Sequence, residues 1–282
     1  MKDYKIQFEV DGKAISLAEI EEMEMSRYHH VFKIFVEKGI AIKLDGVEKT
    51  QDELLSLSRE DAKRALAQTR EEIGKEKTLE LFSDEIKSSD QMWKEINETA
   101  DFSQPYQQAI VDVKTENISL PQFMMFNQLL AKKNDLYMPS TIHPEHYFFD
   151  ANNKGEQRII ETFGMYKDPS YLDLKPAGSK DYPIKPDDDT DIVMMGKTYL
   201  ADSGLDTTIL GMHQLKDRGN GMEVKLGVFL PESAPKEIID GHKWHLMVEF
   251  KNGLEIAAKK KPNFLQKMLF KIVLKKLKSN KN

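Results

Sequence analysis

The chain has 282 residues, of which 40% are hydrophobic and 31% are charged, a composition typical of a globular protein with a sizeable core rather than a disordered one. The 47 acidic residues exceed the 41 Lys and Arg residues and give a net charge of −6, so electrostatics do not favour nucleic acid as a partner. The absence of cysteine excludes disulfides, thiolate nucleophiles and cysteine-bound zinc, so any metal would be held by His, Asp and Glu.

Polar and apolar residues alternate over residues 4–10, ahead of Asp11 and Gly12, which predicts a strand and a turn. Apolar residues at helical spacing predict helices over residues 17–39, 51–77 and 76–98. Turns and aromatic residues replace this pattern after residues 101–105. We therefore expect a mainly helical accessory region over residues 1–103, of a kind that often mediates self-association into a homo-oligomer.

The second predicted region, residues 104–282, mixes strands and helices. Strands are predicted over residues 109–118, 147–149, 158–164, 208–215 and 223–230. Ser119 as N-cap and Pro121 in the first turn predict a helix to about residue 134. Residues 167–191 are rich in Pro, Asp, Tyr and Gly, so we expect a long loop there. A further helix is predicted from residue 234 toward Lys261, with Gly241 and Gly253 as points of interruption.

No run of 18 or more apolar residues is present, so we expect no membrane span and, without a signal segment, a cytoplasmic protein. The last twenty residues instead predict a short amphipathic helix. Such a helix could dock on anionic lipid, but terminal helices more often pack their apolar face on the domain, which is our expectation. The apolar face is Leu265, Met268, Leu269, Ile272 and Val273, and the lysines around it are Lys267, Lys271, Lys275 and Lys278.

Five of the seven histidines fall in the second half of the chain, which is the first indication of a site. His29 and His30, on the first predicted helix, are interpreted as incidental surface residues. The five others are His143, His146, His213, His242 and His245.

His245 and Glu249 are four residues apart on a predicted helix, so their side chains project from one face and can reach a common point. A helix-borne metal pair needs this spacing, although a solvated helix pair has it too. The neighbours Trp244, Leu246 and Phe250 are apolar and indicate a substantially buried helix. An unpaired carboxylate would be costly there, and a bound cation is one way to relieve that cost.

Three further segments could complete a site. In the sequence HPEHY a proline fixes a turn and His146 can point inward, although a capped turn with exposed imidazoles fits equally. Glu161 lies in the apolar run RIIETFG, and buried Glu is rare unless it binds a metal or pairs with a cation such as Arg158. His213 faces core or cavity depending on strand register. Imidazoles and carboxylates suit zinc best, with iron, manganese or cobalt as alternatives, and the lack of cysteine favours a catalytic metal over a structural one.

The ordered series HPEHY, ETFG, HQLKDRGNGMEVKLGVFLP and HLMVEF followed by KKKP resembles the bacterial hydrolases of acyl-phloroglucinols, the diacetylphloroglucinol and phloretin hydrolase family, over about residues 105–262. The resemblance implies an α+β helix-grip (Bet v 1-like) fold, in which an antiparallel sheet surrounds a long C-terminal helix and an N-terminal helical region is added. The interval between the HPEHY turn and Glu161 is shorter than in the diacetylphloroglucinol enzyme, and LGVF stands where the family usually has an aromatic run.

The resemblance also implies roles for individual residues. Zinc would be bound by His146, with His143 as its competitor, and by Glu161, His245 and Glu249. His213 would donate or accept a proton beside the substrate, and Tyr137 would bind a substrate hydroxyl or carbonyl. The implied reaction is hydrolysis of the carbon–carbon bond between an acyl group and a phloroglucinol-type ring, with a small phenolic ketone as substrate and a carboxylic acid and a phloroglucinol as products.

Two other classes of protein remain as alternatives. A helix-grip module that binds an aromatic or lipidic small molecule without transforming it would need an apolar cavity but not four convergent metal ligands. A helical interaction protein acting through residues 15–100 and the basic tail would tolerate substitution of the His and Glu residues above. Metal analysis of the purified protein separates the binding module from the hydrolase.

Overall fold

The computed structural model describes residues 3–133, 135–152, 154–164, 168–178 and 182–266, together with residues 268, 270 and 272. Within these residues, nine strands form one sheet in which every neighbouring pair is antiparallel. In spatial order the strands are β2 (Lys13–Ile15), β1 (Lys5–Val10), β5 (Gln107–Glu116), β11 (Met222–Leu230), β10 (Asp206–Asp217), β9 (Ile192–Leu200), β8 (Ser170–Pro176), β7 (Gln157–Glu161) and β6 (His146–Ala151).

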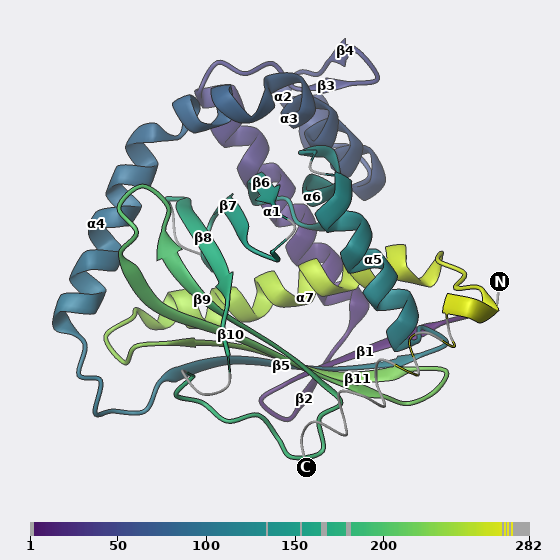
Figure 1. The fold of residues 1–282 in the computed structure, drawn as a ribbon. Helices are drawn as coiled ribbons and strands as arrows, with labels where there is room; N and C mark the ends of the chain where they lie inside the picture. The colour runs from purple at the N-terminus through teal and green to yellow at the C-terminus, as the bar shows by residue number, and fades with distance from the viewer. Residues whose placement is uncertain are drawn as a thin grey trace.

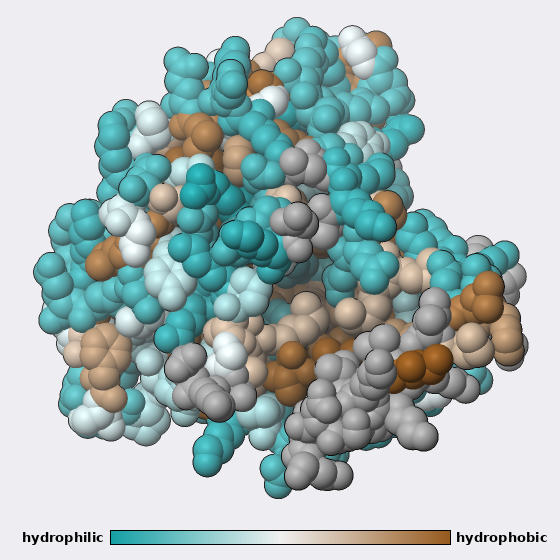
Figure 2. Space-filling view, viewed as in Figure 1, coloured by the Kyte–Doolittle hydropathy of each residue, from teal (hydrophilic) through white to brown (hydrophobic). Residues whose placement is uncertain are grey.

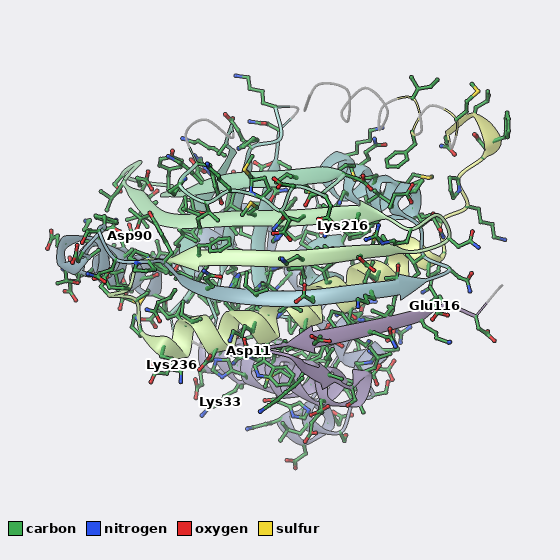
Figure 3. The ribbon with its side chains drawn as sticks, turned by 90° about the horizontal axis from the view of Figure 1, so that it is seen from below. Asp11, Lys33, Asp90, Glu116, Lys216 and Lys236 are labelled. Carbon is green, nitrogen blue, oxygen red and sulfur yellow. The ribbon has the colours of Figure 1, made fainter. Side chains whose placement is uncertain are left out.

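A long helix, α7 (Lys236–Ala258), lies along one face of this sheet, and the strands curve around it (Figure 1). Figure 3 shows the same relation from below, with the strands passing over the helix. Val248, Leu254 and Ala257 are fully buried in this interface, and removing their apolar surface from water stabilises the contact. The helix continues without interruption through Gly241 and Gly253. The predicted α+β helix-grip class is therefore confirmed.

Two shorter helices, α5 (Leu120–Lys133) and α6 (Tyr137–Ile142), pack against α7. A Cβ atom on Gly253 would lie 2.9 Å from the Phe126 ring, so the glycine allows α5 to approach α7 closely. The rings of Phe123 and Phe250 lie 5.5 Å apart at the same contact. These helices complete the wall of the cavity described below.

The N-terminal region contributes four helices: α1 (Leu17–Glu37), α2 (Gln51–Leu55), α3 (Arg59–Leu81) and α4 (Ser83–Thr99), with a small hairpin of β3 (Lys43–Leu44) and β4 (Val47–Glu48). Ser16 and Glu19 form a capping box that begins α1. Helix α1 contacts α3 and α7, whereas α4 lies along β8 and β10. Strands β1 and β2 also belong to this region and extend the main sheet. The boundary near residue 103 stays a prediction.

Two predicted elements are wrong. The expected long loop over residues 167–191 contains β8, and the next strand, β9, is absent from the predicted strands. Pro169 precedes β8 and Pro176 is its last residue, and proline is tolerated at strand ends. The single helix expected over residues 51–77 is two helices, because Ser58 caps the start of α3. Gly74 then kinks α3 with a φ of 76°.

The C-terminal tail differs from the expected packing. Residues 264–266, 268, 270 and 272 have helical backbone, but Leu265, Met268 and Ile272 are 61%, 42% and 47% exposed. The side of the helix that carries Leu265, Met268 and Ile272 therefore faces water, because Phe270, on another side of the helix, makes the contact with the core. Leu269, Val273 and the four predicted lysines lie outside the described residues. Among the described helices, none is both long enough and apolar enough to traverse a bilayer.

Candidate metal centre

Histidines from two distant segments meet beside α7. His143 follows α6 directly and His146 begins β6, whereas His242 and His245 lie in the first half of α7. Glu161, at the end of β7, lies opposite His146 in the antiparallel pairing of β6 and β7. The sheet and the helix thus bring an imidazole and a carboxylate to the buried face of α7.

A glycine allows the strand that carries Glu161 to approach α7. Gly164 has a φ of +75°, and a Cβ atom there would lie only 2.4 Å from the backbone oxygen of Ile238 near the start of α7. No side chain fits in that gap, so the sequence ETFG ends in the residue that this close contact requires.

The donor atoms of three side chains lie close to one another. The Nε2 atoms of His146 and His245 are 3.2 Å apart, and Glu161 Oε2 lies 3.4 Å from the first and 3.7 Å from the second. A tetrahedral zinc ion with bonds of about 2.0–2.1 Å holds neighbouring donor atoms about 3.3 Å apart. The observed separations fit one such ion. The donor atoms of His143, His146 and His245 also lie within 4.8 Å of one another, so the buried three-histidine cluster could hold a metal.

His143 differs from His146 in how its ring is held. The His143 ring stacks on His245 at 3.8 Å with an interplanar angle of 23°. Its Nδ1 atom also accepts a hydrogen bond of 3.1 Å from the Glu145 backbone N–H. The nitrogen lone pairs of His143 lie in the plane of its ring. Because this plane is nearly parallel to the His245 ring, the lone pairs of the two rings run side by side and do not converge on one point. His146 is instead tilted by 47° to His245 and hydrogen-bonded to the Pro139 backbone, an orientation that favours His146 as the ligand.

Burial shifts the pKa of each group in the cluster toward its uncharged form. It lowers the pKa of His146 to about 3 and the pKa values of His143 and His245 well below their usual range. Burial, reinforced by the nearby Glu249 carboxylate, raises the pKa of Glu161 well above its usual range. A divalent cation would reverse the effect on Glu161, because it stabilises an ionised carboxylate and binds neutral imidazoles.

An apolar cavity of about 150 Å³ lies next to this cluster. His146, His213 and Glu249 line it. Burial raises the pKa of Glu249 to about 7 and lowers the pKa of His213 to about 4. His213 Nδ1 accepts a hydrogen bond of 3.4 Å from Gly227 N–H. The apolar wall includes Phe123, Phe126, Leu130, Phe149, Leu215 and Phe250. The cavity therefore combines a large apolar surface with a few polar groups, as in small-molecule sites.

The structure does not bring Tyr137 to this cavity. Tyr137 begins α6, where its backbone N–H bonds to the Glu71 carboxylate at 2.9 Å, and it is not among the described residues of the cavity wall. Asn127, on α5, does line the cavity, and its buried Nδ2 atom has no hydrogen-bond partner within the described part of the chain. A polar residue inside the apolar run FMMFNQLL is the signal that could have found it.

Two buried arginines from the N-terminal helices hold the ligand-bearing segments. Arg27 Nη2 donates to the Gly164 carbonyl at 3.4 Å, and Arg27 Nη1 lies 3.4 Å from the Glu145 carboxylate. Arg70 donates to the Pro144 carbonyl at 2.5 Å. Sequence reasoning missed both residues, although each arginine occupies a position on the apolar face of its helix. The N-terminal region therefore contacts the site directly.

Comparison with known proteins adds little to this geometry. No family model matches the sequence, and no curated protein matches it. Among solved structures the chain is similar to Ara h 8.0201, with a TM-score of 0.38 and 10% sequence identity over 55% of this chain and 99% of that chain. The resemblance to the acyl-phloroglucinol hydrolases stays a prediction.

Proposed function

We propose that this protein is a metal-dependent hydrolase that cleaves the carbon–carbon bond between an acyl group and a phloroglucinol-type ring. The observation that carries the proposal is the closeness of the His146, Glu161 and His245 donor atoms beside an apolar cavity. The order of the sequence motifs, which resembles the acyl-phloroglucinol hydrolases, supports phenolic ketones as the substrate class.

The ligand set that we propose is His146, Glu161 and His245, with Glu249 as a fourth donor. Glu249 lies one helical turn after His245 and therefore on the same face of α7. His143 would support the site from behind His245. Zinc matches these donors and separations, with iron, manganese and cobalt as alternatives. When bound, the ion would supply a Lewis acid and lower the pKa of a water molecule toward 7.

The reaction adds one water molecule across the bond. The hydroxyl group joins the acyl carbon and gives a carboxylic acid, while the remaining hydrogen joins the ring carbon and gives a phloroglucinol. Hydroxyls ortho and para to the acyl group make the ring a leaving group, because the ring carbon can accept the proton through a keto tautomer.

His213 is proposed to deliver a proton to the ring carbon, and the ring oxygen that gives up this proton regains one from the water molecule. The low pKa of His213 keeps the imidazole neutral near pH 7, so it can accept a proton from a ring hydroxyl and return it to the ring carbon. The Asn127 amide would donate a hydrogen bond to a ring hydroxyl or to the acyl oxygen, because its Nδ2 atom is buried at the cavity wall. Tyr137 is not proposed for this role, because it does not line the cavity.

The size of the cavity bears on the substrate. A volume of about 150 Å³ is close to that of an engineered protein cavity that binds benzene, so it accommodates one substituted ring. An acetylated phloroglucinol would place most of its atoms inside. Phloretin would have to extend its aryl-propionyl arm beyond the wall formed by Phe126 and Phe149. We therefore expect faster turnover of the small acetylated ring.

A non-catalytic binding module is the second candidate, and the same apolar cavity favours it. Such a protein would bind a phenolic ketone whether or not metal is present and would release no product. The convergent donor atoms of His146, Glu161 and His245 favour the hydrolase over this module, because a binding cavity does not need them.

Metal content and product release, measured on the same sample, test the proposal. The purified protein should contain about one equivalent of zinc or another divalent metal by mass spectrometry. It should release phloroglucinol-type products from diacetylphloroglucinol or phloretin, lose this activity with a chelator and regain it with added zinc. Full activity without metal would reject the proposal. Substrate binding with stoichiometric metal but no product would assign the module instead.

A further inference from the structure

The positive charge of the chain is concentrated in the segment that follows α7, residues 259–282, called here the C-terminal segment. It contains nine lysines and no Asp, Glu or Arg. The other 258 residues carry all 47 acidic residues against 32 Lys and Arg, a net charge of −15. A strongly basic end is therefore joined to a strongly acidic body.

The described part of the C-terminal segment also exposes large apolar side chains. Phe264 is 79% exposed, and Leu265, Met268 and Ile272 are 61%, 42% and 47% exposed. Brown side chains gather over the described part of this segment in Figure 2, and Figure 3 shows that part lying beyond the ends of the strands. Four such side chains in nine residues are unusual for a surface that only water contacts.

The four exposed side chains lie on one face. Helical backbone at residues 264–266, 268, 270 and 272 turns by about 100° per residue, which places these four within an arc of about 100°. Phe270 falls outside this arc and packs, partly buried, against the main core. The contact of Phe270 thus leaves the apolar arc directed away from the body.

We infer that the C-terminal segment binds the surface of an anionic lipid bilayer. The arc of Phe264, Leu265, Met268 and Ile272 enters the headgroup region, and the lysines contact the acidic headgroups. An apolar helix face in a lysine-rich segment is typical of helices that lie in this interface. The same surface repels the acidic body, so the protein approaches it with the C-terminal segment first.

Two other partners fit the segment less well. A nucleic acid would attract the lysines, but its phosphate backbone offers nothing to an apolar arc. A second copy of the chain would bring nine further lysines to the same place, so self-association through this face is opposed by like charges. A lipid surface complements both the charge and the apolar arc.

Sedimentation of the full-length protein with vesicles tests the inference. Vesicles of phosphatidylcholine alone are compared with vesicles of phosphatidylcholine and phosphatidylglycerol in equal parts. We expect binding to the mixed vesicles to be at least about tenfold tighter, because only these carry negative charge. Binding should weaken strongly when the ionic strength rises from about 0.1 M to about 1 M, since the Debye length falls from about 10 Å to about 3 Å.

Matched variants test whether vesicle binding depends on the C-terminal segment or on exposed apolar side chains anywhere on the protein. The double variant Leu265→Asp/Ile272→Asp should lose about tenfold or more of the affinity, and Lys275→Gln/Lys276→Gln/Lys278→Gln should lose a similar factor. The control is Val47→Asp/Phe102→Asp, since these residues are 58% and 54% exposed elsewhere on the protein. The control should bind mixed vesicles like the unmodified chain.

Two results would overturn the inference. Equal binding to neutral and mixed vesicles would remove the role of charge, and unchanged binding of Leu265→Asp/Ile272→Asp would remove the role of the arc. Light scattering that finds a dimer in solution, dissociated by Leu265→Asp/Ile272→Asp, would assign the face to a second copy and would likewise reject the lipid. Metal content and hydrolysis do not enter any of these measurements.

Discussion

Arg27, on the first helix of the chain, lies 3.4 Å from the carboxylate of Glu145, which stands between the two histidines of the candidate metal turn. Both side chains are buried, with 10% and 1% of their surface exposed. Burial raises the pKa of Glu145 to about 7, and the Arg27 guanidinium opposes that rise. An ion pair between distant parts of the sequence thus holds the turn that carries His143 and His146.

Replacing Arg27 by Ala should destabilise the protein by about 1–3 kcal/mol at pH 8, because the Gly164 carbonyl loses its donor and the buried Glu145, without its nearest cation, is driven to bind a proton. Urea denaturation monitored by circular dichroism measures this loss. Adding Glu145→Gln to Arg27→Ala should restore part of it, because the amide carries no charge. The control is Arg158→Ala, an exposed arginine paired with Asp173, which should cost at most about 1 kcal/mol. Equal losses in the two single variants would contradict the role of the buried pair.

The ligand segments were accessible to sequence reasoning because local spacing defines them. The interval of four residues between His245 and Glu249 fixes a common helix face, and a proline fixes the turn before His146. The role of Arg27 was not accessible, because its partners Glu145 and Gly164 are more than one hundred residues away and only tertiary packing brings them together. Local patterns report the element on which a residue lies, and they do not report its neighbours across the fold.

The strands show the same limit. Strand β8 follows Pro169 and ends at Pro176, and its pairing with β7 and β9 on either side overrides this loop-like composition. The resemblance implied His146 as the ligand and left His143 as its competitor. The choice between the two histidines depends on the orientations of their rings, and the stacking of His143 on His245 is a property of the folded chain.

His143→Ala and His146→Ala should therefore differ in metal content. His146→Ala removes a proposed ligand and should contain no stoichiometric metal after dialysis. His143→Ala removes a ring that supports His245 and should retain metal, with an affinity weakened by about 10–100-fold. Mass spectrometry of dialysed samples and competition with a coloured chelator provide the two measurements. Metal loss in His143→Ala together with metal retention in His146→Ala would show that His143 is the ligand and that His146 is the supporting ring.

His213→Ala should separate metal binding from turnover. The side chain lies in the cavity wall and outside the cluster of donor atoms, so metal content should remain at the level of the unmodified protein. The rate kcat for acyl-phloroglucinol hydrolysis should fall by about 10²–10⁴-fold, the range expected for removal of a general acid or base. His30→Ala, on α1, serves as the matched control and should retain activity. Loss of metal from His213→Ala would show that the residue supports the centre instead.

His213 also leads to a prediction of how stability changes with pH. Burial lowers its pKa to about 4 in the folded protein, compared with 6.5 for an unperturbed histidine. Between these values the unfolded chain binds the proton and the folded protein does not, so this residue makes the free energy of unfolding decrease as the pH falls from 6.5 to 4. His213→Gln removes the titration. Between pH 7 and pH 4 the variant should gain at most about 3 kcal/mol relative to the unmodified protein, with partial exposure reducing this value.

Urea denaturation of both proteins at several pH values between 4 and 7 provides the difference directly, and contributions of titrating groups that do not interact with His213 cancel in it. His30→Gln is the matched control: burial and the nearby Arg27 lower the pKa of His30 as well, but this side chain is half-buried on α1, so a smaller change with pH is expected. A stability difference for His213→Gln that stays constant from pH 7 to pH 4 would mean that His213 is protonated as readily in the folded protein as in water. The apolar wall would then not lower the pKa of His213, and the imidazole would be a stronger base than a side chain with a pKa of about 4.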